Sequence, residues 1–167
     1  MTKQQFIEAV SAEQESLRRF LRGLCAGDGF LADDLAQEAL LKAYLSFDRF
    51  EGHSRFSTWL FRIAYNCYYD HLRKSGREDG WQSLEDGPRE AWNVEDRPSI
   101  DRKYEHQQLY MAIRHLTAHE QAVILLFYME EKSIREIMGI MEMPSGTVRS
   151  CLSRGRQHLR RYLLRSI

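Results

Sequence analysis

The fold of this chain is decided by residues 133–161, SIREIMGIMEMPSGTVRSCLSRGRQHLRR. Ser133 and Glu136 form a capping box, which predicts that a short helix begins here. Pro144 ends this helix, and Ser145 is the natural N-cap of a second one. A short helix, a turn and a longer helix in this order are typical of a helix-turn-helix, which places its second helix in the major groove of DNA.

The second of these helices carries a local positive charge. From Pro144 onward the chain has six arginines and no acid, although its formal net charge is zero. The stripe expected to face inward consists of Val148, Leu152, Leu159 and Leu163. The side chains expected to face outward can reach base edges and phosphates: Thr147, Ser150, Ser153 and Arg154. This pattern favours DNA binding, and the alternative is a solvated arginine face that closes a helical bundle.

The chain of 167 residues is predicted to be all-α, because helical spacing recurs in almost every block and very few segments resemble strands. Its three cysteines are isolated, so neither a disulfide framework nor a cysteine zinc site is indicated, and a reducing cytoplasm fits best. No stretch near the N-terminus resembles a signal peptide, and no apolar run approaches the ~20 residues of a membrane span. We therefore expect a cytoplasmic protein without membrane insertion.

A flexible acidic linker is predicted between two small helical domains. Residues 75–101 contain several glycines and prolines, lack helical periodicity and carry eight acids against three arginines. The predicted parts are a helical domain at 1–75, a linker at 76–101 and a helix-turn-helix domain at 102–167. Trp81 and Trp92 lie in this linker. Either part of it docks on a partner or a domain surface, or the two rings are incidental aromatics of a spacer.

Three helices are expected in the N-terminal domain, at residues 3–24, 31–47 and 57–74. The second has a stripe expected to be buried, which consists of Ala36, Ala39, Leu40, Ala43 and Phe47. Its other face mixes acids and an amide with leucines: Asp34, Gln37, Glu38, Leu41 and Leu45. Because a solvated face seldom needs leucines, we interpret this face as a docking surface for another protein. The alternative is a helix buried on two sides.

The third helix has a face on which aromatic, basic and amide side chains alternate. They recur at steps of three and four: Trp59, Arg62, Asn66, Tyr69 and Arg73. Such a face suits single-stranded DNA, because rings stack on bases and cations follow the backbone. In the preceding loop Phe50 and Phe56 bracket polar groups, a mixture that can hold a single base. The alternative is that the aromatic residues merely fill a helical bundle.

Three blocks of sequence, in order along the chain, resemble the bacterial sigma factors of the extracytoplasmic-function (ECF) group. They are DDLAQEALLKAY at 33–44, FEGHSRFSTWLFRIAYN at 50–66 and PSGTVRSCLSRGR at 144–156. The resemblance implies two helical domains. One would bind the clamp of core RNA polymerase and the melted minus-ten promoter element, and the other would read the minus-thirty-five element as duplex. The implied function is transcription initiation, without enzymatic activity or a cofactor.

The resemblance also implies roles for individual residues. Polymerase binding would fall to Asp34, Gln37, Glu38 and Leu41. A flipped minus-ten base would enter the loop that contains Phe50, His53 and Ser54, although the family usually has a small or polar residue in place of this histidine. The strand-separation and minus-ten surface would consist of Trp59, Arg62, Asn66, Asp70 and Arg73. The minus-thirty-five contacts would be Ser145, Thr147, Arg149, Ser150, Ser153 and Arg154. A further implied partner is an anti-sigma factor that holds the protein inactive.

Two clusters invite an enzymatic interpretation. His115, His119 and Glu120 have metal-ligand spacing, but Thr117 and Glu120 form a capping box that starts a helix at 121–128. The two histidines should therefore not share one continuous face, and no third ligand lies nearby. A second cluster consists of the acids Asp33, Asp34 and Glu38. No phosphate-cradling glycine loop or nucleophile accompanies them, so we predict no enzyme and no metal site.

The main alternative function is a stand-alone helix-turn-helix regulator that binds duplex operator DNA as a symmetric dimer. It explains the C-terminal helices equally well. It leaves the exposed faces of the helices at 31–47 and 57–74 without a role.

Overall fold

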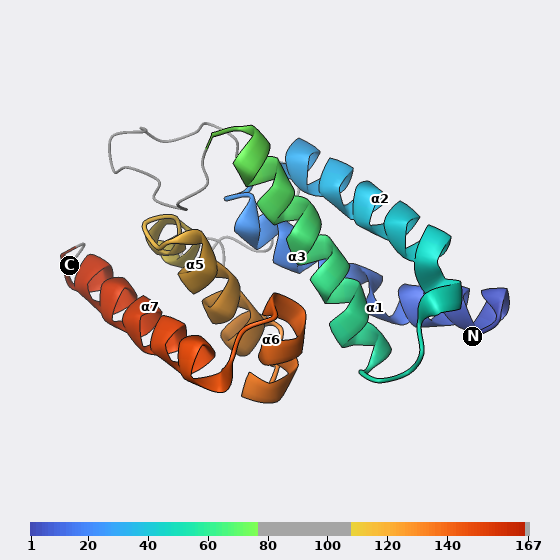
Figure 1. Cartoon of the computed structure of the whole chain (residues 1–167). Coiled ribbons are helices and arrows are strands. Elements are labelled where there is room, and N and C mark those ends of the chain that lie inside the picture. The colour runs from blue at the N-terminus through green and yellow to red at the C-terminus, as the bar shows by residue number, and fades with distance from the viewer. Residues whose placement is uncertain (77–107, 166–167) are drawn as a thin grey trace.

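Figure 1 shows the computed structural model of the chain, which describes residues 1–76 and 108–165. The fold is all-α, as predicted. Trp81 and Trp92 of the predicted linker lie outside the described residues, so their docking stays a prediction. In the two described ranges, no helix combines the length and the apolar character that crossing a bilayer would require.

The N-terminal domain consists of three long helices and one short turn of helix. Their bounds are α1 Lys3–Leu24, α2 Gly29–Ser46, η1 Phe47–Arg49 and α3 Phe56–Lys74. Thr2 and Gln5 form a capping box that begins α1. Asp28 begins α2 slightly earlier than predicted, because its carboxylate accepts a hydrogen bond from the backbone N of Leu31 at 3.1 Å. The chain turns between α1 and α2 through left-handed conformations at Ala26 and Gly27.

The C-terminal domain contains the predicted helix-turn-helix. After a helical segment at 108–113, its elements are α5 Ala118–Ile124, η3 Leu125–Met129, α6 Ile134–Met141 and α7 Ser145–Arg165. The helix α5 begins directly after Thr117, whose hydroxyl accepts from the backbone N of Glu120 at 3.3 Å, rather than at the predicted residue 121. Glu142 takes a left-handed conformation with φ 54°, which turns the chain from α6 towards α7.

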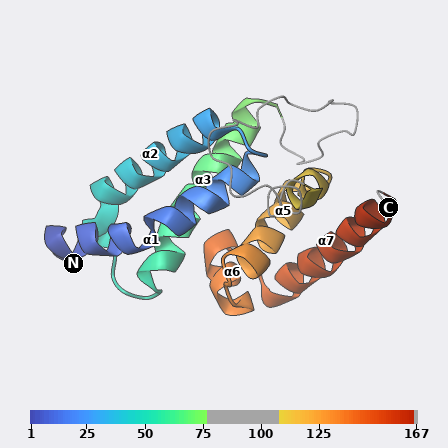
Figure 2. The ribbon, with the colours of Figure 1, turned by 180° about the vertical axis from the view of Figure 1, so that it is seen from behind.

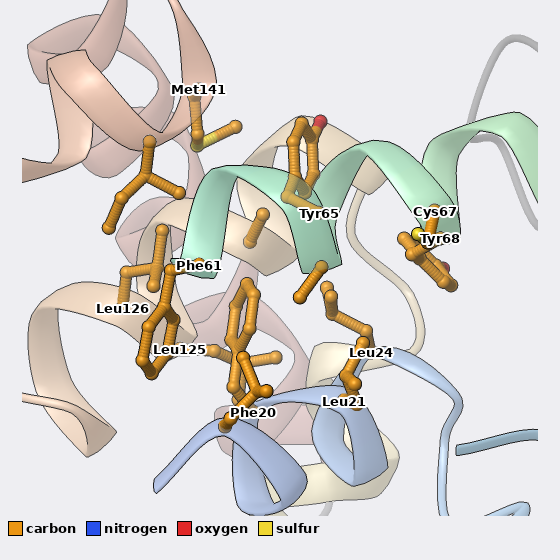
Figure 3. Close-up of a cluster of buried hydrophobic side chains, with 14 of the residues drawn as sticks. Phe20, Leu21, Leu24, Phe61, Tyr65, Cys67, Tyr68, Leu125, Leu126 and Met141 are labelled. Carbon is orange, nitrogen blue, oxygen red and sulfur yellow. The ribbon is translucent and has the colours of Figure 1, made fainter. Parts of the chain in front are cut away.

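The two domains pack directly on each other, an arrangement that the sequence did not predict. Helix α3 contacts α6, and α1 contacts η3 and α5. Figures 1 and 2 show α2 and α7 at opposite sides of the molecule, with α3, α5 and α6 between them. Figure 3 shows side chains of both domains in one apolar cluster: Phe20, Leu21, Leu24, Phe61, Tyr65, Leu125, Leu126 and Met141. The described residues therefore share one continuous core.

All three cysteines lie in this interior. Cys25, Cys67 and Cys151 are buried and unpaired. Burial raises the pKa of the Cys25 thiol to about 12 and raises the pKa values of Cys67 and Cys151 above their usual range. The thiol form is therefore favoured at all three positions at neutral pH.

Candidate functional site

Helix α2 has the two faces that its sequence predicts. Its inner face packs on α1 and α3 through Ala32, Leu35, Ala36, Ala39 and Ala43. Its outer face is exposed and contains Asp34, Gln37, Glu38, Leu41 and Leu45. The side chains of Leu41 and Leu45 are 59% and 72% exposed, so the alternative of a helix buried on two sides is wrong. We call this outer face the α2 face.

Sequence reasoning missed one residue of the α2 face, Phe30, which is 78% exposed. It precedes Asp34 by one turn and Leu41 by three, so helical spacing places it on the same stripe. The prediction started the helix at residue 31 and therefore left Phe30 in a loop. An N-cap at Asp28 was the signal that places it on the helix.

The loop between η1 and α3 is anchored by three aromatic rings. The ring centroid of Phe50 lies 5.8 Å from that of Phe56 and 5.3 Å from that of Trp59. Between these anchors, Gly52 has φ +77°, which allows the chain to turn. His53 is exposed at the tip, where its Nε2 lies 2.8 Å from Oε2 of Glu51. Ser54 is half-buried. The ends of the loop are thus held by packed aromatic rings, and its polar tip is accessible to solvent.

The polar face of α3 is divided into an open part and a covered part. Asn66, Asp70 and Arg73 are exposed, and a weak ion pair joins the last two at 3.9 Å. Trp59 is half-buried in the aromatic cluster. Arg62 is also half-buried, because its Nε donates a hydrogen bond to the carbonyl oxygen of Gly139 in α6 at 2.7 Å. The structure therefore does not bring the five predicted strand-binding residues together on one open surface.

Further along α3, aromatic residues contact α5. The hydroxyl of Tyr65 lies 2.8 Å from Nδ1 of His119, and the ring of Tyr69 stacks on the same imidazole with centroids 5.6 Å apart. Burial raises the pKa of Tyr65 and lowers that of His119, so both side chains are neutral at neutral pH. Tyr65 and Tyr68 are buried, as the bundle-filling alternative predicts for these two. Tyr69 is covered by the C-terminal domain rather than open to solvent.

Helix α7 keeps most of its predicted polar face open. Thr147, Arg149, Ser150, Ser153 and Arg154 are exposed. Ser145 is half-buried, and its hydroxyl accepts a hydrogen bond from Nε of Arg149 at 3.1 Å. The inward stripe is buried at Val148 and Leu152, and half-buried at Leu159 and Leu163. The solvated-arginine alternative remains compatible with this geometry alone.

Glu120 of α5 is the second residue that sequence reasoning missed as part of the site. Its side chain is only 4% exposed, and its Oε2 lies 3.0 Å from Nδ1 of His158. Its Oε1 lies 3.7 Å from Nε of Arg154. Gly155 allows this approach, because a Cβ there would lie 2.9 Å from Cγ1 of Ile124. The buried carboxylate of Glu120 in α5 therefore lies against Arg154 and His158 of α7, a helix that contains no acidic residue.

The two clusters with an enzymatic interpretation are dispersed. His119 contacts Tyr65, whereas the ring of His115 packs on Tyr162 with centroids 4.3 Å apart. Asp33 pairs with Arg18 at 3.1 Å on the surface. Among residues 1–76 and 108–165, no group of three or more histidine, cysteine or acidic side chains has the arrangement of a metal site.

Two parts of the chain match known families. Residues 9–78 match the family described as sigma-70 region 2, and residues 106–159 match the one described as sigma-70, region 4. The chain is 33% identical over 141 residues to the ECF RNA polymerase sigma factor SigW of Bacillus subtilis, covering 79% of this chain and 75% of that protein. It is 34% identical over 134 residues to the ECF RNA polymerase sigma-E factor of Escherichia coli K12, with coverages of 74% and 69%.

Solved structures resemble the whole chain. The sigma factor RpoE of Bartonella quintana, solved in complex with the anti-sigma factor NepR, superposes with a TM-score of 0.77 at 30% identity, over 95% of this chain and 96% of that one. CnrH, solved with the cytosolic domain of CnrY, gives a TM-score of 0.71 at 20% identity, over 97% and 89%, and supports the fold alone. The superposition on RpoE covers both domains and hence includes their mutual arrangement.

Proposed function

We propose that this chain, which belongs to the ECF sigma factors of RNA polymerase and directs the polymerase to promoters, divides these tasks between its two domains. The observation that carries the proposal is the pairing of an exposed α2 face with an exposed basic helix α7 at the opposite side of one chain. We place the domains at residues 1–75 and 102–167, joined by a linker at 76–101.

The α2 face is the proposed contact with core polymerase. Leu41 provides an exposed apolar centre, and the polar neighbours around it are Asp34, Gln37 and Glu38. Glu38 is partly engaged by Lys42, whose Nζ lies 2.9 Å away. An apolar centre within a polar rim is the usual composition of a protein interface.

The loop after η1 and the polar face of α3 are the proposed minus-ten surface. The loop tip would receive a flipped base between the anchors at Phe50 and Phe56, with His53 and Ser54 as its polar groups. The separated strand would then follow the side chains of α3: Trp59, Arg62, Asn66, Asp70 and Arg73. Stacking of bases on aromatic rings contributes ~1–3 kcal/mol per base, enough for a few contacts to help keep a short bubble open.

Helix α7 is the proposed reader of the minus-thirty-five duplex. Its first turns present hydroxyl and guanidinium groups, which bond to base edges and phosphates: Ser145, Thr147, Arg149, Ser150, Ser153 and Arg154. The stand-alone dimeric regulator is set aside, because a match to sigma-70 region 2 gives the α2 and α3 faces a role that a regulator does not need.

Regulation by an anti-sigma factor is a further part of the proposal. It is supported by the similarity to RpoE, which was solved in complex with the anti-sigma factor NepR. We also propose that the protein acts in the cytoplasm, where promoter DNA and polymerase are found. The test is a pull-down with candidate anti-sigma proteins encoded near this protein. If none of them bound this chain, an anti-sigma factor would be ruled against.

The test of the proposed function is run-off transcription with bacterial core polymerase on fragmented genomic DNA of the source organism. New start sites that share two spaced upstream elements are expected only when the protein is added. The Leu41→Asp variant should abolish them without unfolding the protein, because this side chain is 59% exposed. No new start sites, together with operator binding by the free protein, would support the regulator instead.

A further inference from the structure

We propose that Glu120 of α5 is a positioning residue for promoter recognition. Without touching DNA, it holds Arg154 of α7 in the orientation that reads one base pair of the minus-thirty-five element. This role rests on the proposed function, in which α7 lies in the major groove of that element. It gives a side chain outside α7 control over how strictly one base pair is read.

Helices α5 and α7 pack side by side, and they approach closely at Gly155 (Figures 1 and 2). A Cβ at this position would lie 2.9 Å from Cγ1 of Ile124 and 3.7 Å from Cβ of Glu120. The missing side chain therefore allows the backbone of α7 to come this near to α5. Because Arg154 directly precedes Gly155, the same approach brings its side chain next to the carboxylate of Glu120.

The carboxylate of Glu120 is held in place by its own domain. The side chain is only 4% exposed. Its Oε2 lies 3.0 Å from Nδ1 of His158 and accepts a longer hydrogen bond, at 3.4 Å, from the backbone N of Thr117. Because an ionised carboxylate can only accept hydrogen bonds, Nδ1 of His158 is the donor. Glu120 is thus too buried to contact DNA, but it presents a fixed negative charge to α7.

Arg154 is held along one edge of its guanidinium group. Its Nε lies 3.7 Å from Oε1 of Glu120, and its Nη2 donates to Sγ of Cys151 at 3.6 Å. Nε and Nη2 share one edge of the planar group, so both contacts keep that edge towards the protein. Nη1 takes part in neither contact, and 56% of the side chain is exposed. The end of the group, with Nη1 and the second proton of Nη2, is therefore the part that can reach a base.

A guanidinium held in this way is suited to reading a base edge. Arginine commonly donates two parallel hydrogen bonds to N7 and O6 of guanine, which requires a defined orientation of its plane. A long side chain loses rotamer freedom on binding, and a partner that orients it beforehand reduces this cost. Glu120 should therefore increase the preference of Arg154 for the correct base pair over the other three.

A purely structural role of Glu120 predicts a different result. Glu120 belongs to the capping box of α5 and bonds to His158, so it would merely hold α5 and α7 together. Its loss would then lower stability and weaken all promoters alike. Simple electrostatics predicts a third result: phosphates repel a carboxylate, so loss of the charge would strengthen binding to every sequence. Only a positioning role predicts weaker discrimination at one base pair.

The experiment is run-off transcription with core polymerase and limiting amounts of the full chain. The templates are a promoter found by the run-off mapping and derivatives with each base pair of its minus-thirty-five element substituted in turn. The proteins are wild type, Glu120→Gln, Arg154→Ala and the double variant, each checked by thermal unfolding. Glu136→Gln is the matched control, because it removes the same charge at the N3 position of α6, where Glu136 contacts Ser133 and Arg55.

The measured quantity is the ratio of transcript from the original promoter to that from each derivative. Arg154→Ala identifies the base pair that Arg154 reads, because the ratio falls there. At this base pair Glu120→Gln should lower the ratio roughly two- to fivefold, as expected of an ion pair that is open to solvent on one side. Glu136→Gln should leave all ratios unchanged, and Glu120→Gln should change none in the Arg154→Ala background. An unchanged ratio in Glu120→Gln, or an equal fall at every base pair, would overturn the positioning role.

Substitutions of His158 test the same role from the other side of the carboxylate. His158→Leu removes the donor to Oε2 and should lower the ratio at the same base pair. His158→Asn, whose amide N can replace Nδ1 as the donor, should keep the ratio near that of wild type. Equal losses in the two variants would contradict the orientation of Glu120 by His158.

A measurement without DNA separates this role from the proposed function. The Nε–H signal of Arg154 in the NMR spectrum of the full chain can be identified by its loss in Arg154→Ala. In Glu120→Gln it should shift and become more mobile, whereas in Glu136→Gln it should not change. A signal that did not respond would overturn the positioning role alone. If no substitution in the minus-thirty-five element affected transcription by wild type, the proposed reading by α7 would fail and the positioning role with it.

Discussion

Helix α7 presents its polar face to solvent, whereas α3 turns half of its polar face towards the other domain. On α7, five of the six residues proposed to read duplex DNA are exposed. On α3, Arg62 is bonded to Gly139 and Tyr69 is stacked on His119, while Asn66 and Arg73 stay exposed. The proposed duplex-reading surface is therefore exposed, whereas part of the proposed strand-binding surface is covered by the C-terminal domain.

The largest effect on stability is expected from Arg19→Ala, which removes a contact between the two domains. This change leaves the buried carboxylate of Glu130 without its cation, and breaking one side of a buried pair costs ~3–5 kcal/mol. Opening of the domains would hydrate Glu130 and limit the loss, so we expect the lower end of this range in urea unfolding. The matched control is Arg18→Ala, which removes only the surface pair with Asp33 and should cost under ~1 kcal/mol. If the two variants lost the same free energy of unfolding, the buried pair of Arg19 with Glu130 would contribute no more to stability than a surface ion pair.

On the open side of the comparison, Arg154→Ala should weaken duplex recognition. A well-placed arginine contributes ~1–3 kcal/mol of discrimination between bases, so transcription from the cognate promoter should fall roughly 5- to 150-fold. The radius of gyration should stay that of wild type, because Arg154 is exposed and contacts Glu120 and Cys151 of its own domain. Arg165→Ala, near the end of the same helix, is the control for lost charge. If both changes reduced transcription equally, Arg154 would act as a general phosphate contact.

A smaller effect is expected from Glu120→Gln, which tests whether Glu120 orients Arg154 of α7. Glutamine can keep the capping box with Thr117 but loses the charge that faces Arg154 and His158. We therefore expect a loss of promoter discrimination smaller than that of Arg154→Ala, with little change in thermal stability. In the Arg154→Ala background the same substitution should have no further effect. An additive loss would mean that Glu120 does not act through Arg154.

The smallest effect expected is a pH dependence of stability that arises from His119, which packs on the covered part of α3. Burial lowers the pKa of His119, so the unfolded chain binds more protons than the folded one below about pH 6.5. The free energy of unfolding should therefore decrease as the pH falls through this region. His119→Asn, which keeps an acceptor for Tyr65, should reduce the slope. The remaining slope includes His115, whose pKa burial also lowers and which packs on Tyr162. Unchanged slopes in wild type and variant would remove His119 from this explanation.

Local rules predicted the helices of both domains well. Apolar spacing is a property of neighbouring residues, and it placed α1 and α3 within one residue of their observed ends. The cap predicted at Ser133 begins α6. The outer α2 face was also predicted, because leucines among acids stand out at helical spacing. Where a cap was misjudged, the error was local: Asp28 begins α2 early enough to include Phe30.

Contacts between distant residues could not be predicted in this way. Arg62 and Gly139 are 77 positions apart, and Glu130 lies 111 positions from Arg19. No spacing rule connects such pairs, so Arg62 was predicted to face solvent with the rest of its stripe. Glu120 was missed for a related reason, since its role depends on α7 crossing α5 at Gly155. A sequence pattern predicts which residues share a face, but not which element covers that face.

The burial of the three cysteines has a consequence for stress signalling. Thiolates react with oxidants far faster than thiols do, and burial with raised pKa values disfavours the thiolate at Cys25, Cys67 and Cys151. Peroxide or an electrophile would therefore be a poor direct stimulus for these positions. A signal of that kind would have to reach this sigma factor through another protein. For the same reason, the three native thiols should react little with a label directed at a cysteine introduced on the surface.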